Sequence, residues 1–438
     1  MKTVKKLVAL LLCAVTCLAL FACKPQSSDS GKKDYSQFAG IVADPKTWYE
    51  EFMNLPVANA NMTEQELRQL CVDAFEANMT FCWTPNAPIT YTYELLDRYS
   101  DVSLPTGNAY SGLFYATGIK DATCGNIWKI LPYYDLETGV IDVEAMGDNA
   151  VVLNNLSSAC SYGAMQAWNR VSNSHGLNGM NSYNQYDSNI VPVGPYTYNR
   201  QHYKFDWLSM TASNDVIAFN GMEVMLESLA QMKMADGLYS SSSYHVMMCA
   251  EDPVVVRNAD GTVNGLESYV LVHEQGADGT HSDKYNYDQS NGVPMRPLGT
   301  TYNKFTFQRL LNTGYVPFTL KEFIGQDPIE PGEVWLGKGG RLENGTDLTV
   351  RQINNQTLCA NYNICTILVE VKSPDGTVLT SFYPPALTNP AELSQSMYGL
   401  LSTEKLASYA DGKNTIHLSA RLSNGELLEA FYTTLKVD

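Results

Sequence analysis

The sequence changes character near residue 328, and this change limits the folds that the chain can adopt. Before it, segments with helical spacing of apolar residues alternate with short apolar runs that are typical of strands. After it, short β-prone runs are separated by turns at 348–353, 365–372, 377–383, 415–422 and 427–437, with a helical stretch within 389–409. The sequence therefore predicts an α+β domain over residues 46–328 and a small Ig-like β-sandwich over residues 329–438.

Several elements are predicted inside the first domain. Helices are expected from the capping box Thr63-Glu64-Gln65-Glu66 onward and over 157–171, 220–234 and 303–312. Strands are expected at 244–250, 253–257 and 268–274, with a hairpin turn at Asn258-Ala-Asp-Gly261. Residues 172–203 are rich in Asn, Ser, Gly and Tyr, which predicts a long loop.

The amino-terminal residues predict export. Lys2, Lys5 and Lys6 precede an uncharged stretch over 7–22, as in a secretory signal peptide. The end of this stretch, Leu20-Phe21-Ala22-Cys23, resembles the lipobox of bacterial lipoproteins, in which the cysteine carries lipid. We therefore expect a signal peptide over 1–22, lipid on Cys23 and a flexible linker over 23–45. The chain would be lipid-anchored at the extracellular face of the bacterial cytoplasmic membrane.

The charge of the chain excludes one class of partner. There are 29 basic and 46 acidic residues, which gives a formal net charge of −17. A protein that binds nucleic acid needs basic patches to replace the counterions of the phosphates. We therefore expect no nucleic-acid partner.

The cysteines point to a candidate nucleophile. Of the ten cysteines, Cys13 and Cys17 leave with the signal peptide and Cys23 carries lipid, so seven remain. An odd number leaves at least one thiol without an intramolecular disulfide. Cys160 lies in the first turn of a predicted helix, where Ser157 or Ser158 would be the cap and the helix dipole favours a thiolate. The simpler alternative is a small core residue.

Two histidines follow Cys160 at strand positions. His245 opens one predicted strand and His273 lies near the end of another, in Tyr269-Val-Leu-Val-His-Glu-Gln275. A thiol, an imidazole base and a polar group that orients the imidazole are the components of a cysteine hydrolase. The alternative is that the histidines are ordinary strand-end residues.

These segments resemble the NlpC-type cell-wall peptidases, a papain-like family with a nucleophile helix on an antiparallel sheet. The resemblance covers about residues 110–275 and rests on four segments in the same order as in the family, namely Gly112-Leu-Phe-Tyr115, Ala159-Cys160-Ser161, His245-Val-Met-Met248 and Leu271-Val-His273. It implies that Cys160 is the nucleophile, His245 the base and His273 the orienting residue. It also implies that Tyr115 lines the oxyanion hole, to which the Cys160 N–H contributes.

The chain departs from the family pattern at several positions. Ala159 stands where the family has Asp, and Tyr162-Gly163 replaces a Gly-apolar pair. The segment between the two histidines is also longer. Glu274 and Gln275 therefore remain alternatives to His273 as the third catalytic residue.

The resulting prediction is a surface lipoprotein that hydrolyses amide bonds, with peptidoglycan stem peptides or other peptides as substrate and no metal or organic cofactor. One rival is a solute-binding lipoprotein for sugars or peptides, because aromatic residues at 81–134 could stack on such ligands. The other is a catalytically inactive papain-like module used for adhesion or as a scaffold.

Overall fold

The computed structural model describes residues 44–95, 98–115, 126–172, 190–197, 212–243, 245–275, 300–384 and 393–437. The predicted signal peptide, the predicted lipidation site Cys23 and nearly all of the predicted linker over 23–45 lie outside these residues, as does most of the predicted loop over 172–203. Within the described ranges, the longest apolar helices all fall short of what is needed to cross a membrane.

Two amino-terminal helices begin at well-formed caps. In α2 (Pro45–Met53), the Asp44 side chain accepts a hydrogen bond from the Thr47 N–H. In α3 (Glu64–Thr80), Thr63 and Glu66 form both hydrogen bonds of the predicted capping box, which confirms that prediction. Helix α3 buries one face, including Leu70 and Phe75, against the rest of the fold.

Small sheets and short helices form an aromatic-rich region next to α2. The strands are β1 (Cys82–Pro85), β2 (Ile89–Leu95), β3 (Arg98–Leu104), β4 (Tyr110–Ser111), β5 (Phe114–Tyr115), β6 (Val140–Ile141) and β7 (Ser157–Ser158). The helices are α4 (Ile127–Ile130), η2 (Leu131–Tyr133), α5 (Val143–Met146) and α6 (Asn149–Leu156). Their aromatic side chains share one hydrophobic core with α2.

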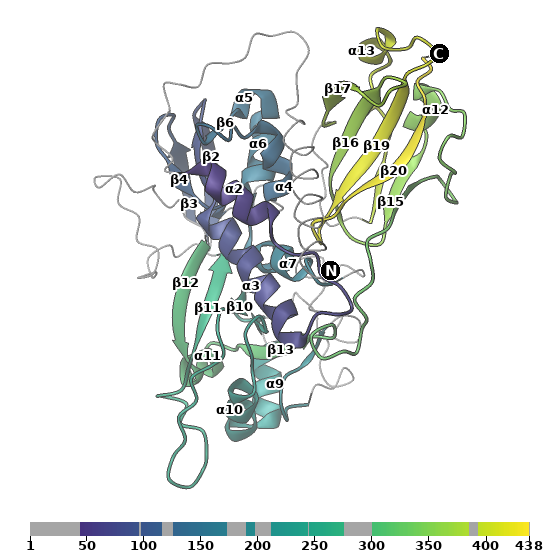
Figure 1. Ribbon diagram of the computed structural model, residues 1–438. Coiled ribbons are helices and arrows are strands. Elements are labelled where there is room, and N and C mark those ends of the chain that lie inside the picture. The colour runs from purple at the N-terminus through teal and green to yellow at the C-terminus, as the bar shows by residue number, and fades with distance from the viewer. Residues whose placement is uncertain are drawn as a thin grey trace, which may run out of the picture.

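The largest sheet among the described residues has six antiparallel strands in the order β12-β11-β10-β9-β13-β8. These strands are β8 (Ile190–Pro192), β9 (Gly237–Ser240), β10 (His245–Cys249), β11 (Tyr269–Gln275), β12 (Thr300–Thr306) and β13 (Val316–Leu320). Helix α7 (Cys160–Trp168) packs on this sheet together with α3 (Figure 1). Gly163 makes the close approach of α7 possible, since a Cβ there would lie 2.9 Å from the Gln275 Cβ.

Three further helices, α9 (Ala212–Asn220), α10 (Met222–Ala230) and α11 (Phe307–Asn312), belong to the same part of the chain. Buried residues of all three join the core of the six-stranded sheet. The α+β fold class is thus confirmed, with antiparallel sheets and covering helices.

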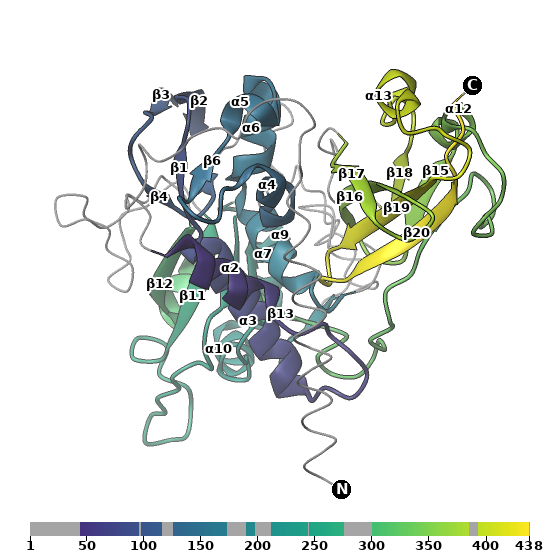
Figure 2. The same ribbon diagram turned by 45° about the horizontal axis from the view of Figure 1, so that its top comes forward.

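The carboxyl-terminal residues form two antiparallel sheets around a core of their own (Figure 2). One sheet has the order β14-β15-β18, from Val334–Leu336, Thr357–Ala360 and Ser394–Ser396. The other has the order β17-β16-β19-β20, from Val378–Phe382, Ile364–Lys372, Thr415–Leu422 and Leu427–Thr434. Two short helices, α12 (Val350–Asn354) and α13 (Thr403–Ala407), accompany them.

The structure corrects several predicted elements. The run at 348–353 is not a strand, because a Thr349–Gln352 capping box starts helix α12 there. The predicted helix over 303–312 begins only at Phe307, and its first part is strand β12. Residues 253–257 make only isolated bridges at Val254 and Arg257. The predicted turn at Asn258–Gly261 is present, closed by the Gly261 N–H on the Asn258 carbonyl at 2.9 Å.

Candidate functional site

Cys160 is the first residue of helix α7, directly after the short strand β7. Strand β7 pairs in parallel with β5, so that Ser158 lies opposite Tyr115. The predicted capping role of Ser157 or Ser158 is wrong, because both are strand residues and Ala159 is the N-cap, without a side-chain hydrogen bond. The N-cap residue therefore supplies no side-chain acceptor to the first N–H groups of the helix.

His245 opens strand β10 and stands opposite Ser240 of β9. Its Nε2 is 2.5 Å from Glu274 Oε2 of the neighbouring strand β11. This bond leaves Nδ1 as the ring nitrogen for a second partner. The His245 side chain is 15% exposed and that of Glu274 is 11% exposed, so little water competes for the bond.

Cys160 and His245 hydrogen-bond to each other and shift each other's pKa. Burial raises the pKa of the Cys160 thiol, but the hydrogen bond and charge of His245 and the N–H groups of Val246 and Ser161 outweigh it, so the pKa is lowered. Burial lowers the pKa of His245, but the bonds and negative charges of Cys160 and Glu274 raise it to about 10. These shifts favour a thiolate beside an imidazolium over a neutral pair.

Glu274 is in turn held by Asn303 of strand β12, whose Nδ2 donates to Glu274 Oε1. The register explains why these side chains meet. Met248 stands opposite His273, which brings Met247 next to Glu274 by extension of the same register, and Asn303 stands opposite Val272. Because residues two apart on a strand share a face, His245, Glu274 and Asn303 all project from one face of three adjacent strands. The result is a chain of hydrogen bonds from Cys160 through His245 and Glu274 to Asn303.

His273 does not lie in this chain of hydrogen bonds, contrary to the role that the family resemblance implies. It is next to Glu274 in β11, so its side chain projects from the opposite face of the sheet. There its ring stacks on Phe75 of α3 at 5.4 Å between centroids, and its Nε2 is 3.4 Å from Glu76 Oε1. His273 is fully buried and belongs to the packing of α3 on the sheet. Of the three alternatives for the third residue, the structure places Glu274 beside His245.

Gln275, the other alternative, also projects toward the helices. Its Nε2 donates to the Leu113 carbonyl at 2.9 Å, and its Cβ faces Gly163 of α7. It therefore ties the segment before β5 to the face of β11 that α7 covers. It does not orient His245.

Two tyrosines lie near the thiol and the imidazole. Tyr115, predicted to line the oxyanion hole, is buried and stands across the β5–β7 pair from Ser158, two residues before Cys160. Tyr315 presents its ring edge-on to His245, with 6.4 Å between centroids. Burial raises the pKa of Tyr315, and the charges of Glu274 and Cys160 raise it further. A neutral tyrosine hydroxyl at this place can donate a hydrogen bond.

Sequence reasoning missed Asn303 and Tyr315. The apolar spacing predicts one helix over 303–312, although Thr300-Thr-Tyr-Asn-Lys-Phe-Thr306 is rich in β-branched and aromatic residues. That enrichment is the signal that could have identified the strand. Tyr315 had no local signal, because it approaches His245 only through the pairing of β13 with β9.

Other reactive groups are accounted for within the described residues. Cys71, Cys249 and Cys365 are buried thiols whose pKa is raised mainly by burial. Cys359 and Cys365, close enough in sequence for a disulfide, do not form one. No group of three His, Cys, Asp or Glu side chains in this part of the chain is arranged to hold a metal ion. Cys124 lies outside it.

Comparisons with known proteins give no relative for this chain. No protein-family model, no curated protein and no solved structure matches it.

Proposed function

We propose that this chain is a cysteine hydrolase of the papain-like type, with Cys160 as nucleophile, His245 as acid and base, and Glu274 as the residue that orients His245. The observation that carries the proposal is the run of contacts Cys160–His245–Glu274. The pKa of the Cys160 thiol is lowered, and the His245 imidazole beside it is fixed at Nε2 by the Glu274 carboxylate 2.5 Å away. Such an arrangement suits acyl transfer through a thioester.

In the first step, the Cys160 thiolate attacks the carbonyl carbon of an amide, and a C–S bond forms as the carbonyl electrons move to oxygen. The Cys160 N–H at the start of α7 donates a hydrogen bond to that oxyanion. His245 then gives its Nδ1 proton to the amide nitrogen, and the C–N bond breaks. The amine leaves and an acyl-thioester remains on Cys160.

In the second step, His245 takes a proton from water, and the resulting hydroxide attacks the thioester carbonyl. The C–S bond breaks, the carboxylic acid leaves, and the thiolate beside protonated His245 is restored. Throughout the cycle Glu274 holds His245 by Nε2, which keeps Nδ1 directed at the sulfur. Asn303 in turn fixes the other carboxylate oxygen of Glu274.

The substrate class and the compartment belong to the same proposal. The resemblance of four segments to the NlpC-type peptidases favours peptidoglycan stem peptides, and the lipobox-like Leu20–Cys23 favours a lipid-anchored protein outside the cytoplasmic membrane. The two carboxyl-terminal sheets with a shared core favour an Ig-like module that serves as a spacer or contact domain.

The first test measures the reactivity of the thiol. We expect iodoacetamide to modify one cysteine of the purified protein much faster than the others at pH 6–7, because only a thiolate reacts. The fast phase should disappear in Cys160→Ser and persist in the control Cys359→Ser, which removes a half-buried thiol of the carboxyl-terminal domain. Uniformly slow labelling of all cysteines would contradict a nucleophilic Cys160.

The second test separates an enzyme from an inactive module of the same fold. Purified peptidoglycan is incubated with the wild-type protein and with Cys160→Ser, and new amino groups and released peptides are measured by mass spectrometry. Release that depends on Cys160 supports the proposed substrate. A fast-reacting thiol without any hydrolysis of peptidoglycan or of a general peptide library would overturn the hydrolase.

A further inference from the structure

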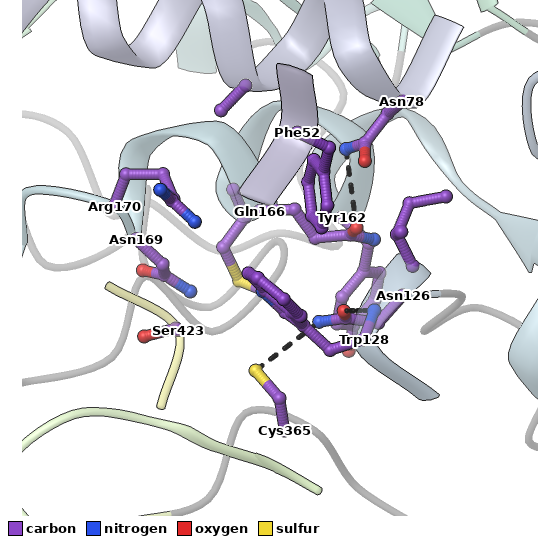
Figure 3. Close-up of a pocket in the computed structure, with 13 residues that line it drawn as sticks. Phe52, Asn78, Asn126, Trp128, Tyr162, Gln166, Asn169, Arg170, Cys365 and Ser423 are labelled. Carbon is purple, nitrogen blue, oxygen red and sulfur yellow. Dashed lines mark hydrogen bonds between the residues drawn. The ribbon is translucent and has the colours of Figure 1, made fainter. Parts of the chain in front are cut away.

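A small cavity lies on the side of helix α7 that faces away from the six-stranded sheet. Its volume is about 30 Å³, room for roughly two water molecules or one small ion. Residues of α7 and of the segment that follows it line one side, α4 lines a second, and Cys365 and Ser423 of the carboxyl-terminal sheets line a third (Figure 3). The cavity is therefore a junction between the two sequence-predicted domains.

Arg170 contributes a buried guanidinium to this cavity. Its residue is 3% exposed, and Figure 3 shows its side chain directed toward the other lining residues. Nη2 donates to the Pro56 carbonyl at 3.3 Å, but Nε and Nη1 find no hydrogen-bond partner in the described part of the chain. Ser423 Oγ, in the same lining, also lacks one there. Buried donors without acceptors are costly, so an acceptor inside the cavity would stabilise the fold.

The charge around the cavity is positive, although the chain as a whole is strongly acidic. The guanidinium carbon of Arg421 lies 4.7 Å from the centre of the Trp128 ring, and that of Arg170 lies 5.9 Å from it. No Asp or Glu is among the residues that line the cavity. Burial lowers the pKa of Arg170 to about 10, and the charge of Arg421 lowers it as well.

The carboxyl-terminal part of the chain packs closely against Arg170 at a glycine. Gly425, in the turn between β19 and β20, has a φ of +98°, and a Cβ there would lie 2.7 Å from Arg170 Nη1. Its carbonyl accepts a hydrogen bond from Arg421 Nη1 at 2.8 Å. The absence of a side chain at Gly425 therefore lets this turn pack directly against the Arg170 guanidinium.

We propose that this cavity binds a small anion of about the size of chloride, held by Arg170 with Ser423 and the amide of Asn169 as further donors. The anion accepts the hydrogen bonds that the Arg170 guanidinium has to donate. Its negative charge also balances the positive charges of Arg170 and Arg421. Bound there, it stabilises the docking of the carboxyl-terminal sheets on helix α7. The proposal is independent of the proposed hydrolase, because the cavity lies on the other side of α7 from the sheet that carries His245.

Thermal unfolding of the full-length protein tests the proposal. Sodium chloride replaces sodium gluconate at constant ionic strength, because gluconate is too large for the cavity. We expect Tm to rise by about 2–5 °C and to saturate with chloride. Bromide and formate should act similarly, and acetate and phosphate progressively less, as the anion grows. An equal Tm in chloride and gluconate would overturn the site.

Two variants and one diffraction measurement complete the test. Arg170→Met should lose the chloride-dependent rise in Tm, whereas Arg351→Met, an exposed arginine of α12, should keep all of it. If Arg170→Met does not fold, crystals of the wild-type protein soaked in bromide decide the question. An anomalous peak in contact with Arg170 and Ser423 supports the proposal. Water alone in the cavity, or the same chloride effect in Arg170→Met, contradicts it.

Discussion

Among the described residues, two histidine–glutamate hydrogen bonds have nearly the same length, one in each part of the chain. In the six-stranded sheet, His245 Nε2 is 2.5 Å from Glu274 Oε2. In the carboxyl-terminal sheet, His417 Nδ1 is 2.6 Å from Glu429 Oε2. Both pairs join adjacent antiparallel strands. By hydrogen-bond length alone the two are equivalent.

The pairs differ in what the second ring nitrogen meets. His417 Nε2 is 2.9 Å from Thr415 Oγ1, and the ring stacks on Tyr432, so the imidazole is fully engaged in its own sheet. The second partner of His245 is the Cys160 thiol, presented by the start of a helix. Glu429 is also 38% exposed, against 11% for Glu274. A carboxylate that hydrogen-bonds to a histidine therefore does not by itself indicate a catalytic site. It indicates a candidate catalytic site where a buried thiol contacts the second ring nitrogen of the same histidine.

Removing each histidine should give the largest contrast between the two regions. His245→Ala should lower the kcat of hydrolysis by about 10⁴–10⁶-fold, because the thiol then has no base and the leaving amine has no acid. It should also slow alkylation of Cys160 at pH 6–7, by about tenfold for each unit that the thiol pKa rises. His417→Ala should leave both rates unchanged. Equal effects of the two substitutions on alkylation would place the imidazole of His245 outside the reaction.

Substituting the two carboxylates, Glu274 and Glu429, should give the next largest contrast, which is seen in the pH dependence of hydrolysis. Glu274 raises the pKa of His245, so the imidazolium is present at pH values below about 10 and is lost as the pH rises through that value. Glu274→Gln should therefore shift the alkaline limb of hydrolysis to lower pH and reduce kcat by about 10²–10⁴-fold. The matched variant Glu429→Gln should alter neither. A reduced kcat with an unmoved alkaline limb would mean that Glu274 acts on the fold and not on His245.

The sequence was sufficient to predict the parts of the site that depend on local pattern. Cys160 at a helix start and His245 at a strand start follow from short-range spacing of apolar residues. The residue that contacts His245 does not follow from local pattern. His273, Glu274 and Gln275 are consecutive in one strand, and only the pairing of β10 with β11 decides which of them faces His245. The structure selects Glu274 by alternation of the two faces.

The errors in the predicted elements also have physical causes. Phe307-Gln-Arg-Leu-Leu-Asn312 is helical, and extending that helix backward to Asn303 ignored the cap at Thr306, whose side chain accepts from the Arg309 N–H. Because Asn303 is placed in a helix by this extension, the sequence does not identify it as a hydrogen-bond partner of Glu274. Among the carboxyl-terminal residues, β-prone Val350 and Ile353 lie in helix α12 because Thr349 and Gln352 cap it. Local capping outweighs β propensity in such short segments.

The smallest effect is expected from Asn303, one of the two residues that sequence reasoning missed. Asn303→Ala removes one hydrogen bond to Glu274, which corresponds to about a 2–10-fold loss in kcat. Its alkaline limb should move in the same direction as in Glu274→Gln, but less, because the carboxylate remains. Thr415→Val removes the corresponding support of His417 and should leave hydrolysis unchanged. Kinetics of Asn303→Ala in the Glu274→Gln background decide the point. If Asn303 acts through Glu274, its substitution has no further effect there; an undiminished loss would give Asn303 a separate role.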